Sequence, residues 1–312
     1  MRIVVVGAGG VGGYFGARLA EAGHEVTFVA RGRHLAAVRE RGALLVRSPL
    51  GDVRVGAGHF VESPADVREA DVVLVAVKLW DTEDVAAGLR HLTDRGARVL
   101  SLQNGVEKDT VLRRHLPDDA VWGGVCYIAA VIEEPGVVVH RGALQRIVLG
   151  AYEGRPADGV AEFQQACVKA GIDAEVGADI ARTVWEKYVF LTGLSATTTA
   201  VRQPIGVIRR NPGSRELLRE VMAEAVAVGR AAGVDLDEAF TDAQMAAVDG
   251  LPAGMASSMA HDLERGNRLE VPWLSGGVVS LGQRLGVPTP RNRTVADILA
   301  PYELGRPASP DA

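Results

Sequence analysis

The first half of the chain alternates short apolar runs with segments of helical periodicity. Several runs are continuously apolar, which is typical of parallel strands covered by helices on both faces. Helical spacing of apolar residues appears between them, at Gly12–Ala22 and Thr82–His91. This alternation predicts a doubly wound α/β sheet. The expected strands are Arg2–Val6, Glu25–Ala30, Val72–Val77, Arg98–Leu102 and Val121–Tyr127, followed by a late hairpin of Val137–His140 and Gln145–Leu149.

Beyond about residue 178 only helical periodicity remains. The length of 312 residues suits two domains. We place the boundary near Gly177–Asp179, with a Rossmann-type doubly wound sheet over residues 1–178 and an all-α domain over residues 179–312. The expected helices of the second domain are Ile180–Ser195, Ser214–Ala232, Leu236–Val248, Ala253–Arg265 and Trp273–Leu285.

Composition narrows the class of protein. The net charge of −5 and the pI near 5.9 give no whole-chain attraction to nucleic acid or to an anionic membrane, so neither is expected as a partner. Two cysteines, Cys126 and Cys167, are too few for a disulfide framework or a cysteine-rich metal site. No apolar run reaches the roughly 18 residues of a membrane span. We expect a cytoplasmic protein without a metal, and we leave its oligomeric state, including a homodimer, open.

A glycine motif follows the first expected strand. Gly7-Ala8-Gly9-Gly10-Val11-Gly12 has the pattern G-x-G-x-x-G between an apolar strand and an amphipathic helix. In a dinucleotide site the first glycine permits a tight turn, the second lets the backbone approach the pyrophosphate, and the third allows close packing of helix and strand. The alternative is a glycine-rich turn without a ligand. The full β-α-β context favours a dinucleotide cofactor held at the helix N-terminus.

The end of the second expected strand indicates which dinucleotide. NAD enzymes usually place an acidic residue there for the ribose 2′-hydroxyl, whereas a basic residue accommodates the 2′-phosphate of NADP. Here the strand runs into Ala30-Arg31-Gly32-Arg33 without an acid. The guanidinium of Arg31 matches phosphate oxygens, although a solvated loop arginine would look the same. We therefore predict NADP(H).

Polar residues follow two further strands at the edge where doubly wound folds bind ligands. Lys78 follows Val72–Val77, and Asn104 follows the strand that ends at Leu102. A lysine there can counter cofactor phosphate, and an asparagine can hold the nicotinamide ribose or a substrate oxygen. Each alone could be a turn residue, but their occurrence on successive strands favours function.

The helical half contains two candidates for acid–base chemistry. Lys187 stands in Trp185-Glu186-Lys187-Tyr188, and Glu270 in Arg268-Leu269-Glu270. Hydride delivery to a ketone leaves an alkoxide, so such a site needs a proton donor, and a desolvated lysine can serve. A carboxylate can orient the substrate hydroxyl and the lysine. Most lysines and glutamates on helices are solvated, and the sequence alone does not bring these two together.

The order and spacing of these pieces resemble the ketopantoate reductase (2-dehydropantoate 2-reductase) family nearly from end to end. These enzymes use NADPH to reduce 2-dehydropantoate to pantoate in pantothenate biosynthesis, and they join a Rossmann domain to an all-α domain. The resemblance rests on the glycine motif, Arg31, Val-Lys-x-Trp at Lys78, Gln-Asn-Gly at Asn104, Trp-x-Lys at Lys187, Ser257-Ser258-Met259-x-x-Asp262, and Glu270 twelve residues after Ser258.

Carried onto this sequence, the resemblance implies a role for each matching residue. The cofactor contacts would be Gly7, Ala8, Gly9, Gly10, Val11 and Gly12 on the pyrophosphate, Arg31 on the 2′-phosphate, and Lys78, Asn104 and the backbone of Ala130 (or Ala129) elsewhere. Lys187 would bind substrate and give a proton to its carbonyl. Ser258, Ser195 and Asn104 would also bind substrate, which is expected to be a small 2-oxo acid. Glu270 would lie near the nicotinamide ribose and the substrate hydroxyl, as a catalytic and a cofactor-binding residue.

The sequence departs from the family at substrate-binding asparagines. Two of these follow the catalytic lysine by four and eight residues, on the same helical face. Leu191 and Ser195 occupy those positions here, and Ile205 occupies that of a third. An unpaired buried polar atom costs about 1–3 kcal/mol, so this change should weaken recognition of a polar hydroxyacid. The hypotheses are a ketopantoate reductase with a rearranged pocket, or a paralogue that reduces a more apolar 2-oxo acid or another ketone.

Two other readings compete with these. The 3-hydroxyisobutyrate, glycerol-3-phosphate and opine dehydrogenases share the architecture, but the Gln-Asn-Gly segment and the arrangement of Lys187 and Glu270 argue against them. A non-catalytic NADP(H)-binding sensor would need the glycines but neither Lys187 nor Glu270, and both are present.

Overall fold

The computed structural model describes residues 1–306, which form two compact units. The α/β unit comprises Met1–Asn104 and Lys108–Thr183, and the helical unit comprises Gly105–Glu107 and, of the described residues, those from Val184 to Arg306. The division between Thr183 and Val184 lies close to the boundary expected at residue 178. Because Gly105–Glu107 also belongs to the helical unit, the two units are not divided at a single point in the chain.

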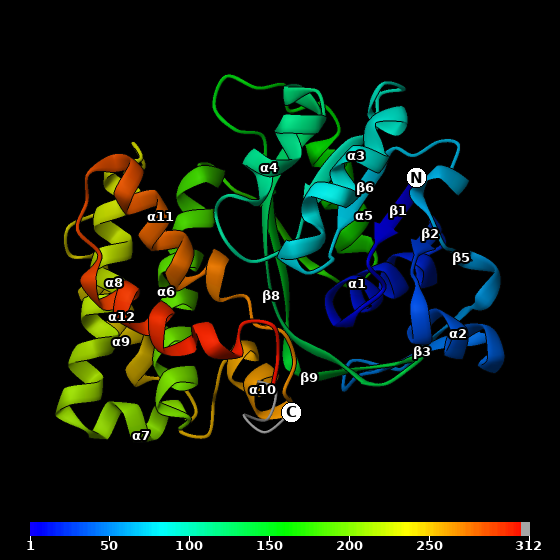
Figure 1. The fold of residues 1–312 in the computed structure, drawn as a ribbon. Coiled ribbons are helices and arrows are strands. Elements are labelled where there is room, and N and C mark those ends of the chain that lie inside the picture. The colour runs from blue at the N-terminus through cyan, green and yellow to red at the C-terminus, as the bar shows by residue number, and fades with distance from the viewer. Residues whose placement is uncertain (307–312) are drawn as a thin grey trace. The chain divides into compact units, whose positions relative to one another are not determined.

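The α/β unit is built on a ten-stranded mixed sheet, found among the described residues (Figure 1). Its strand order is β4-β3-β9-β8-β7-β6-β1-β2-β5, and β10 pairs with β9. Strand β1 pairs in parallel with both β2 and β6, so the strand order reverses at β1. This topology confirms the predicted fold class. The strands are β1 Arg2–Val6, β2 Glu25–Val29, β3 Ala43–Arg47, β4 Val53–Gly56, β5 Phe60–Val61, β6 Val72–Val75, β7 Arg98–Ser101, β8 Val121–Glu134, β9 Val137–Gly150 and β10 Asp173–Val176.

Each face of the sheet is covered by helices, which explains the continuously apolar strands. On β1, Ile3 and Val5 enter one core cluster, whereas Val4 and Val6 enter another on the opposite face. The first cluster also holds side chains of α1 (Gly10–Glu21), α2 (Gly32–Arg41) and α5 (Val160–Lys169). The second holds side chains of α3 (Thr82–Thr93) and α4 (Lys108–His115). Both faces of these strands are therefore buried.

The expected late hairpin was wrong. Val137–His140 and Gln145–Leu149 belong to one continuous strand, β9, which pairs antiparallel with β8. Gly142, with φ of +77°, and its exposed neighbours interrupt the apolar pattern and so look like a turn. A register shift between Ile128 and Ala130 absorbs this irregularity instead. Because β8 continues to Glu134, Ala130 lies within that strand rather than after it.

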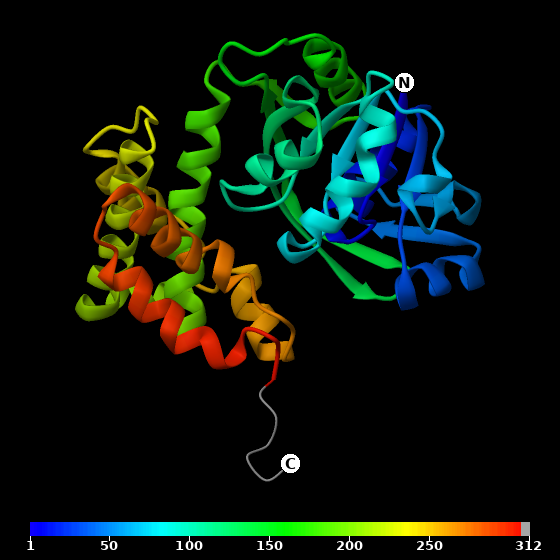
Figure 2. The ribbon, with the colours of Figure 1, turned by 45° about the horizontal axis from the view of Figure 1, so that its top comes forward.

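The helical unit packs around α8. This helix contacts α7, α9, α11 and α12, and its apolar side chains join those of α6 in one core cluster. Gly193 on α6 allows a close approach to α8, because a Cβ there would lie 2.5 Å from atoms of Met222. Figure 2 shows α6 as the long green helix of this unit. The helices are α6 Ile180–Val201, α7 Ile205–Arg210, α8 Pro212–Ala231, α9 Phe240–Asp249, α10 Ser258–Arg265, α11 Ser275–Leu285 and α12 Pro290–Leu299.

Candidate cofactor site and acid–base residues

The glycine motif forms the turn between β1 and α1, at the point where the strand order reverses. Gly7 has φ of +100°, a conformation that L side chains rarely adopt, and its N–H donates to the Val29 carbonyl at 3.0 Å. A Cβ on Gly7 would lie 2.8 Å from the backbone nitrogen of Val77. The ends of β1, β2 and β6 thus pack so closely around this turn that only glycine fits. Open α/β sheets bind ligands in the crevice at such a reversal.

The amino end of α1 is accessible at Gly9 and tightly packed on either side of it. The nearest heavy atom to a Cβ on Gly9 would be Ile132 Cδ1, at 4.0 Å. No side chain caps the helix at Gly9 and its first turn has no acidic residue, so its N–H groups suit an anion. Gly10 is different, since a Cβ there would lie 2.9 Å from Val131 N and closer still to the Ala130 carbonyl. The backbone of Ala130 therefore lies against the glycine turn.

Arg31 follows β2 and is the N-cap residue of α2. Its side chain is 71% exposed, and its guanidinium donates to Asp81 Oδ1 at 2.7 Å. Asp81 is the N-cap residue of α3, but its carboxylate makes no capping hydrogen bond. The carboxylate binds the guanidinium of Arg31 instead. Asp81 follows Lys78 by three residues, so this ion pair joins the Arg31 segment to the segment that carries Lys78. Asp81 carries no sequence signal for this contact, because its partner lies fifty residues away in the chain.

A buried amide network joins the segments that carry Lys78 and Asn104. The parallel register pairs Val75 with Ser101, so the ends of β6 and β7 are level. Gln103, which is buried, donates from Nε2 to the Val77 carbonyl at 3.0 Å and to Thr82 Oγ1 at 2.8 Å. Its Oε1 accepts from Ser101 Oγ at 3.0 Å. Lys78 and Asn104, each adjacent to a residue of this network, therefore belong to segments fixed at the same edge as the glycine turn.

A second buried network holds the residues that follow Asn104. Lys108 Nζ lies 2.8 Å from Asp109 Oδ2 and donates to the Ser101 carbonyl at 3.3 Å. The Tyr152 hydroxyl donates to the same Asp109 carboxylate at 2.6 Å. Burial, and then the negative charge of Asp109, raise the pKa of Tyr152, so the phenol stays a neutral donor. No local pattern signals this ion pair, because adjacent Lys and Asp residues on a helix are usually solvated.

In the helical unit, the turn of α6 that carries Lys187 is fastened beside Glu270. Tyr188 donates from its hydroxyl to the Leu274 carbonyl at 2.8 Å and to the Trp273 carbonyl at 3.1 Å. Burial, and then the negative charge of Glu107, raise the pKa of Tyr188, so it remains a donor at any ordinary pH. Glu270 is buried and its carbonyl accepts from Leu274 N at 3.1 Å. The structure thus brings together the segments of Lys187 and Glu270, which the sequence could not do.

The three positions that lack the family's asparagines differ in exposure. Leu191 is half-buried, whereas Ser195 is fully buried and its hydroxyl has no hydrogen-bond partner within residues 1–306. Ile205 is also fully buried in the core of the helical unit, and its N–H donates to the Met255 carbonyl at 2.8 Å. Ser258 is exposed at the first position of α10. The isoleucine therefore serves packing, and its side chain adds no polar group.

Within the described part of the chain, no cluster of three or more histidine, cysteine, aspartate or glutamate side chains could hold a metal ion. In the same residues, none of the helices has the length and apolar character that crossing a membrane requires.

Comparison with known proteins gives one consistent result. Residues 3–154 match the family described as "Ketopantoate reductase PanE/ApbA", and residues 179–303 match its "C terminal". The chain is 35% identical to the 2-dehydropantoate 2-reductase of Halobacterium salinarum over 300 residues, which are 96% of this chain and 98% of that protein.

Solved structures agree. A PanE/ApbA family ketopantoate reductase from Ralstonia eutropha superposes with a TM-score of 0.87 at 34% identity, covering 97% of this chain and 98% of that one. D-mandelate dehydrogenase, solved with NADH and anilino(oxo)acetate, has the same fold at 19% identity, with a TM-score of 0.88 and coverage of 97% and 98%. The chain therefore belongs to the ketopantoate reductase family of oxidoreductases that act on CH–OH groups.

Proposed function

We propose that this protein reduces a 2-oxo acid to a 2-hydroxy acid with NADPH, and that its substrate is 2-dehydropantoate, the precursor of pantoate in pantothenate biosynthesis. The proposal rests on the presence of two features in this one member of the family. One is a glycine turn that is open at Gly9. The other is a lysine-bearing turn of α6 that Tyr188 fastens beside the Glu270 segment.

The surroundings of Arg31 support NADPH over NADH. Arg31 and Arg33 are both exposed at the start of α2, and the first turn of that helix has no acidic residue. A 2′-phosphate would add two negative charges at a helix N-terminus already flanked by guanidinium groups. Asp81 holds Arg31 in place and competes with the phosphate for the same donor. Lys78 and Asn104, fixed at the same edge, would contact the cofactor elsewhere.

The chemistry assigns distinct tasks to Lys187 and Glu270. Bound NADPH supplies a hydride to the carbonyl carbon of the substrate. Lys187 gives a proton to the carbonyl oxygen, so that the alkoxide is neutralised as it forms. Glu270 accepts a hydrogen bond from the new hydroxyl and keeps the lysine oriented. Ser258, which is exposed on α10, would bind the substrate.

The absence of the family's substrate-binding asparagines favours a second candidate function, the reduction of a different 2-oxo acid. Leu191 is half-buried and apolar, and Ile205 is buried in the core. Neither side chain supplies the amide group of an asparagine. A pocket in which Leu191 replaces an asparagine would suit a 2-oxo acid with a more apolar side chain than that of 2-dehydropantoate.

Lys187→Ala tests the proposed chemistry. Turnover of NADPH with a 2-oxo acid should fall by about 100-fold or more, while NADPH binding, followed by its fluorescence, stays largely unchanged. Near-wild-type turnover would remove Lys187 from the role of proton donor. If the wild-type protein binds NADPH but consumes none with any 2-oxo acid, a non-catalytic NADP(H)-binding sensor would replace the reductase.

A further inference from the structure

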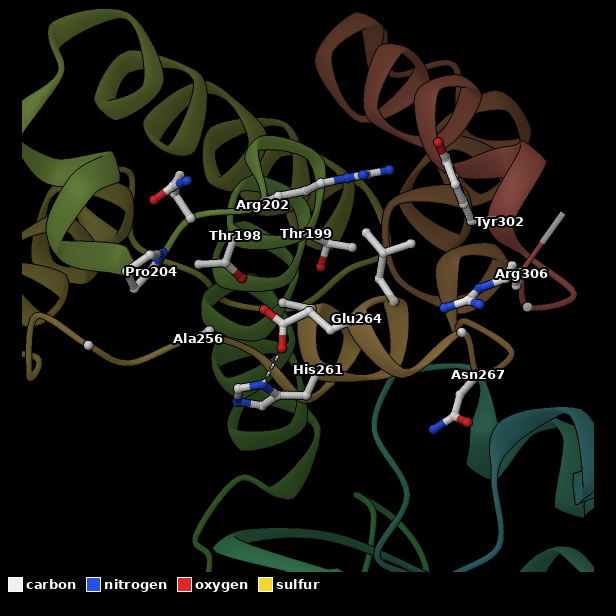
Figure 3. Close-up of a pocket in the computed structure, with 16 residues that line it drawn as sticks. Thr198, Thr199, Arg202, Pro204, Ala256, His261, Glu264, Asn267, Tyr302 and Arg306 are labelled. Atoms are coloured by element: carbon white, nitrogen blue, oxygen red, sulfur yellow. Dashed lines mark hydrogen bonds and ion pairs between the residues drawn. The ribbon is translucent and has the colours of Figure 1, made fainter.

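The helical unit contains a cavity of about 470 Å³ at the carboxyl end of α6 (Figure 3). Its wall is formed by the last turn of α6, the 254–256 loop, α10 and the segment 302–306. None of Lys187, Ser195, Ser258 and Glu270 lines it. These four side chains therefore form no part of the wall, although the wall residues Ala256 and Ala260 flank Ser258 in the chain.

Distance along α6 separates the cavity from the proposed proton donor. Thr198 and Thr199 line the cavity, and they follow Lys187 on the same helix by eleven and twelve residues. At a rise of 1.5 Å per residue, this separation is about 16–18 Å. A 2-oxo acid of five or six carbons is too short to contact Lys187 and occupy this cavity at the same time.

The side chains in the cavity give it a positive charge. Arg202 and Arg306 both line it, and neither forms an ion pair with any residue in the range 1–306. Among the described residues of the wall, the one carboxylate is that of Glu264, which lies 3.3 Å from the ring of His261. Figure 3 shows this pair at α10, and Arg202 and Arg306 on either side of Tyr302. The described wall thus holds two guanidinium groups and one carboxylate, which already has a neighbour.

The backbone of Arg202 is unusual. Among the described residues it is the one non-glycine residue with positive φ, at 56°, and it directly follows the last residue of α6. Glycine is the usual residue at this position because it adopts the left-handed conformation without strain. The guanidinium lies 5.1 Å from the centre of the Tyr302 ring, which holds it at the cavity. An arginine here ends the helix less well than glycine would, but it supplies a positioned donor.

The hydroxyl of Thr198, which lines the cavity four residues before Arg202, is already hydrogen-bonded. Thr198 Oγ1 donates to the Leu194 carbonyl at 2.6 Å and to Ser257 Oγ at 3.0 Å. Ser257 Oγ also accepts from Ala260 N at 3.0 Å. These buried hydroxyls are already engaged, which leaves Arg202 and Arg306 as the guanidinium donors among the described lining residues.

We propose that this cavity binds a small anion with two or more carboxylate or phosphate groups, as a site separate from the one that reduces the substrate. Arg202 and Arg306 would each take an anionic group through charge-assisted hydrogen bonds.

Isothermal titration of the full-length protein at low ionic strength tests this, with citrate as the carboxylate probe and pyrophosphate as the phosphate probe. Arg202→Gly removes the donor and relieves the left-handed strain, so its melting temperature should equal or exceed that of the wild type. Arg306→Ala is the second variant. Arg210→Ala removes an exposed arginine of α7 outside the cavity and is the matched control. Binding of at least one probe should weaken by about tenfold or more in the first two variants and stay unchanged in the control.

The outcome separates the alternatives. A loss confined to citrate identifies a carboxylate site, and a loss confined to pyrophosphate identifies a phosphate site. Equal affinities of the wild type, Arg202→Gly and Arg306→Ala for both probes would overturn the proposal, as would the absence of binding to the wild type. Because the titration needs neither NADPH nor a 2-oxo acid, its result does not depend on the proposed reductase activity.

Discussion

Adding one methyl group at Gly12 should destabilise the α/β unit. Gly12 lies in the first turn of α1, where the helix crosses the end of β1. A Cβ there would lie 3.0 Å from both Ala76 Cβ and Val5 Cγ1, and closer still to the carbonyl oxygen of Gly7. That oxygen belongs to the backbone of the turn itself, so no side-chain rotation can relieve the clash. Gly12→Ala therefore forces α1 away from the sheet.

The size of the effect follows from overpacking. Inserting a methyl group into a well-packed region costs about 1–3 kcal/mol. For a unit of this size each kcal/mol shifts the melting temperature by about 2–4 °C, so the loss should be about 2–12 °C. The displaced turn would also bind NADPH more weakly.

Gly9→Ala is the matched control, because it adds the same methyl group three residues earlier. The nearest atom to the new Cβ is 4.0 Å away, and the φ of −75° is negative, outside the left-handed region that only glycine adopts freely. Stability should change by less than about 0.5 kcal/mol. Affinity for NADPH should nevertheless fall by about tenfold or more, because the methyl group occupies the surface that the pyrophosphate approaches.

Thermal unfolding and NADPH fluorescence titration of both variants separate packing from binding. We predict that Gly12→Ala lowers the melting temperature and that Gly9→Ala lowers only the affinity for NADPH. Equal melting temperatures for Gly12→Ala and the wild type would refute the packing argument. Wild-type NADPH affinity in Gly9→Ala would refute the placement of the pyrophosphate.

Three further predictions concern specificity and pH. Arg31→Ala should raise the KM for NADPH and leave NADH kinetics nearly unchanged, whereas equal losses with both cofactors would contradict the 2′-phosphate assignment. Leu191→Asn combined with Ser195→Asn should improve kcat/KM for 2-dehydropantoate if the substrate has diverged, and no gain would indicate a compensated pocket. Burial lowers the pKa of His34 below its ordinary 6.5, and its neutral Nδ1 accepts the Gly136 N–H at 3.2 Å. This contribution to stability is present above pH 6.5 and is lost as the pH falls below it. Melting temperatures measured across that range should fall more steeply for the wild type than for His34→Asn, and parallel curves would exclude His34 as a cause.

The parts of the fold that could be predicted from the sequence are those that a local pattern of residues determines. Continuous apolar strands such as Arg2–Val6 and Val72–Val75 require helices on both faces, and the structure has them. The glycine turn was equally predictable, because the space around Gly7 and Gly12 admits nothing larger. The long strand β9 was not, because Gly142 imitates a turn and only pairing with β8 keeps the strand continuous.

The supporting contacts of the candidate site depend on tertiary structure, and no local pattern signals them. Asp81 meets Arg31 across fifty residues, and Gln103 meets Thr82 across twenty-one. Both pairs form because parallel strands end at the same edge of one sheet. At Ile205 the resemblance to the family implies a substrate-binding position, but the side chain lies in the core of the helical unit. Position in the chain alone did not reveal this burial.

The most direct test of the proposed function is consumption of NADPH by the purified protein, with 2-dehydropantoate compared against a panel of branched and aromatic 2-oxo acids. We predict steady oxidation of NADPH with 2-dehydropantoate as the preferred substrate. A strong preference for another acid would retain the reductase and reassign its substrate. No oxidation of NADPH with any 2-oxo acid, in a protein that is folded and binds NADPH, would contradict the proposed function.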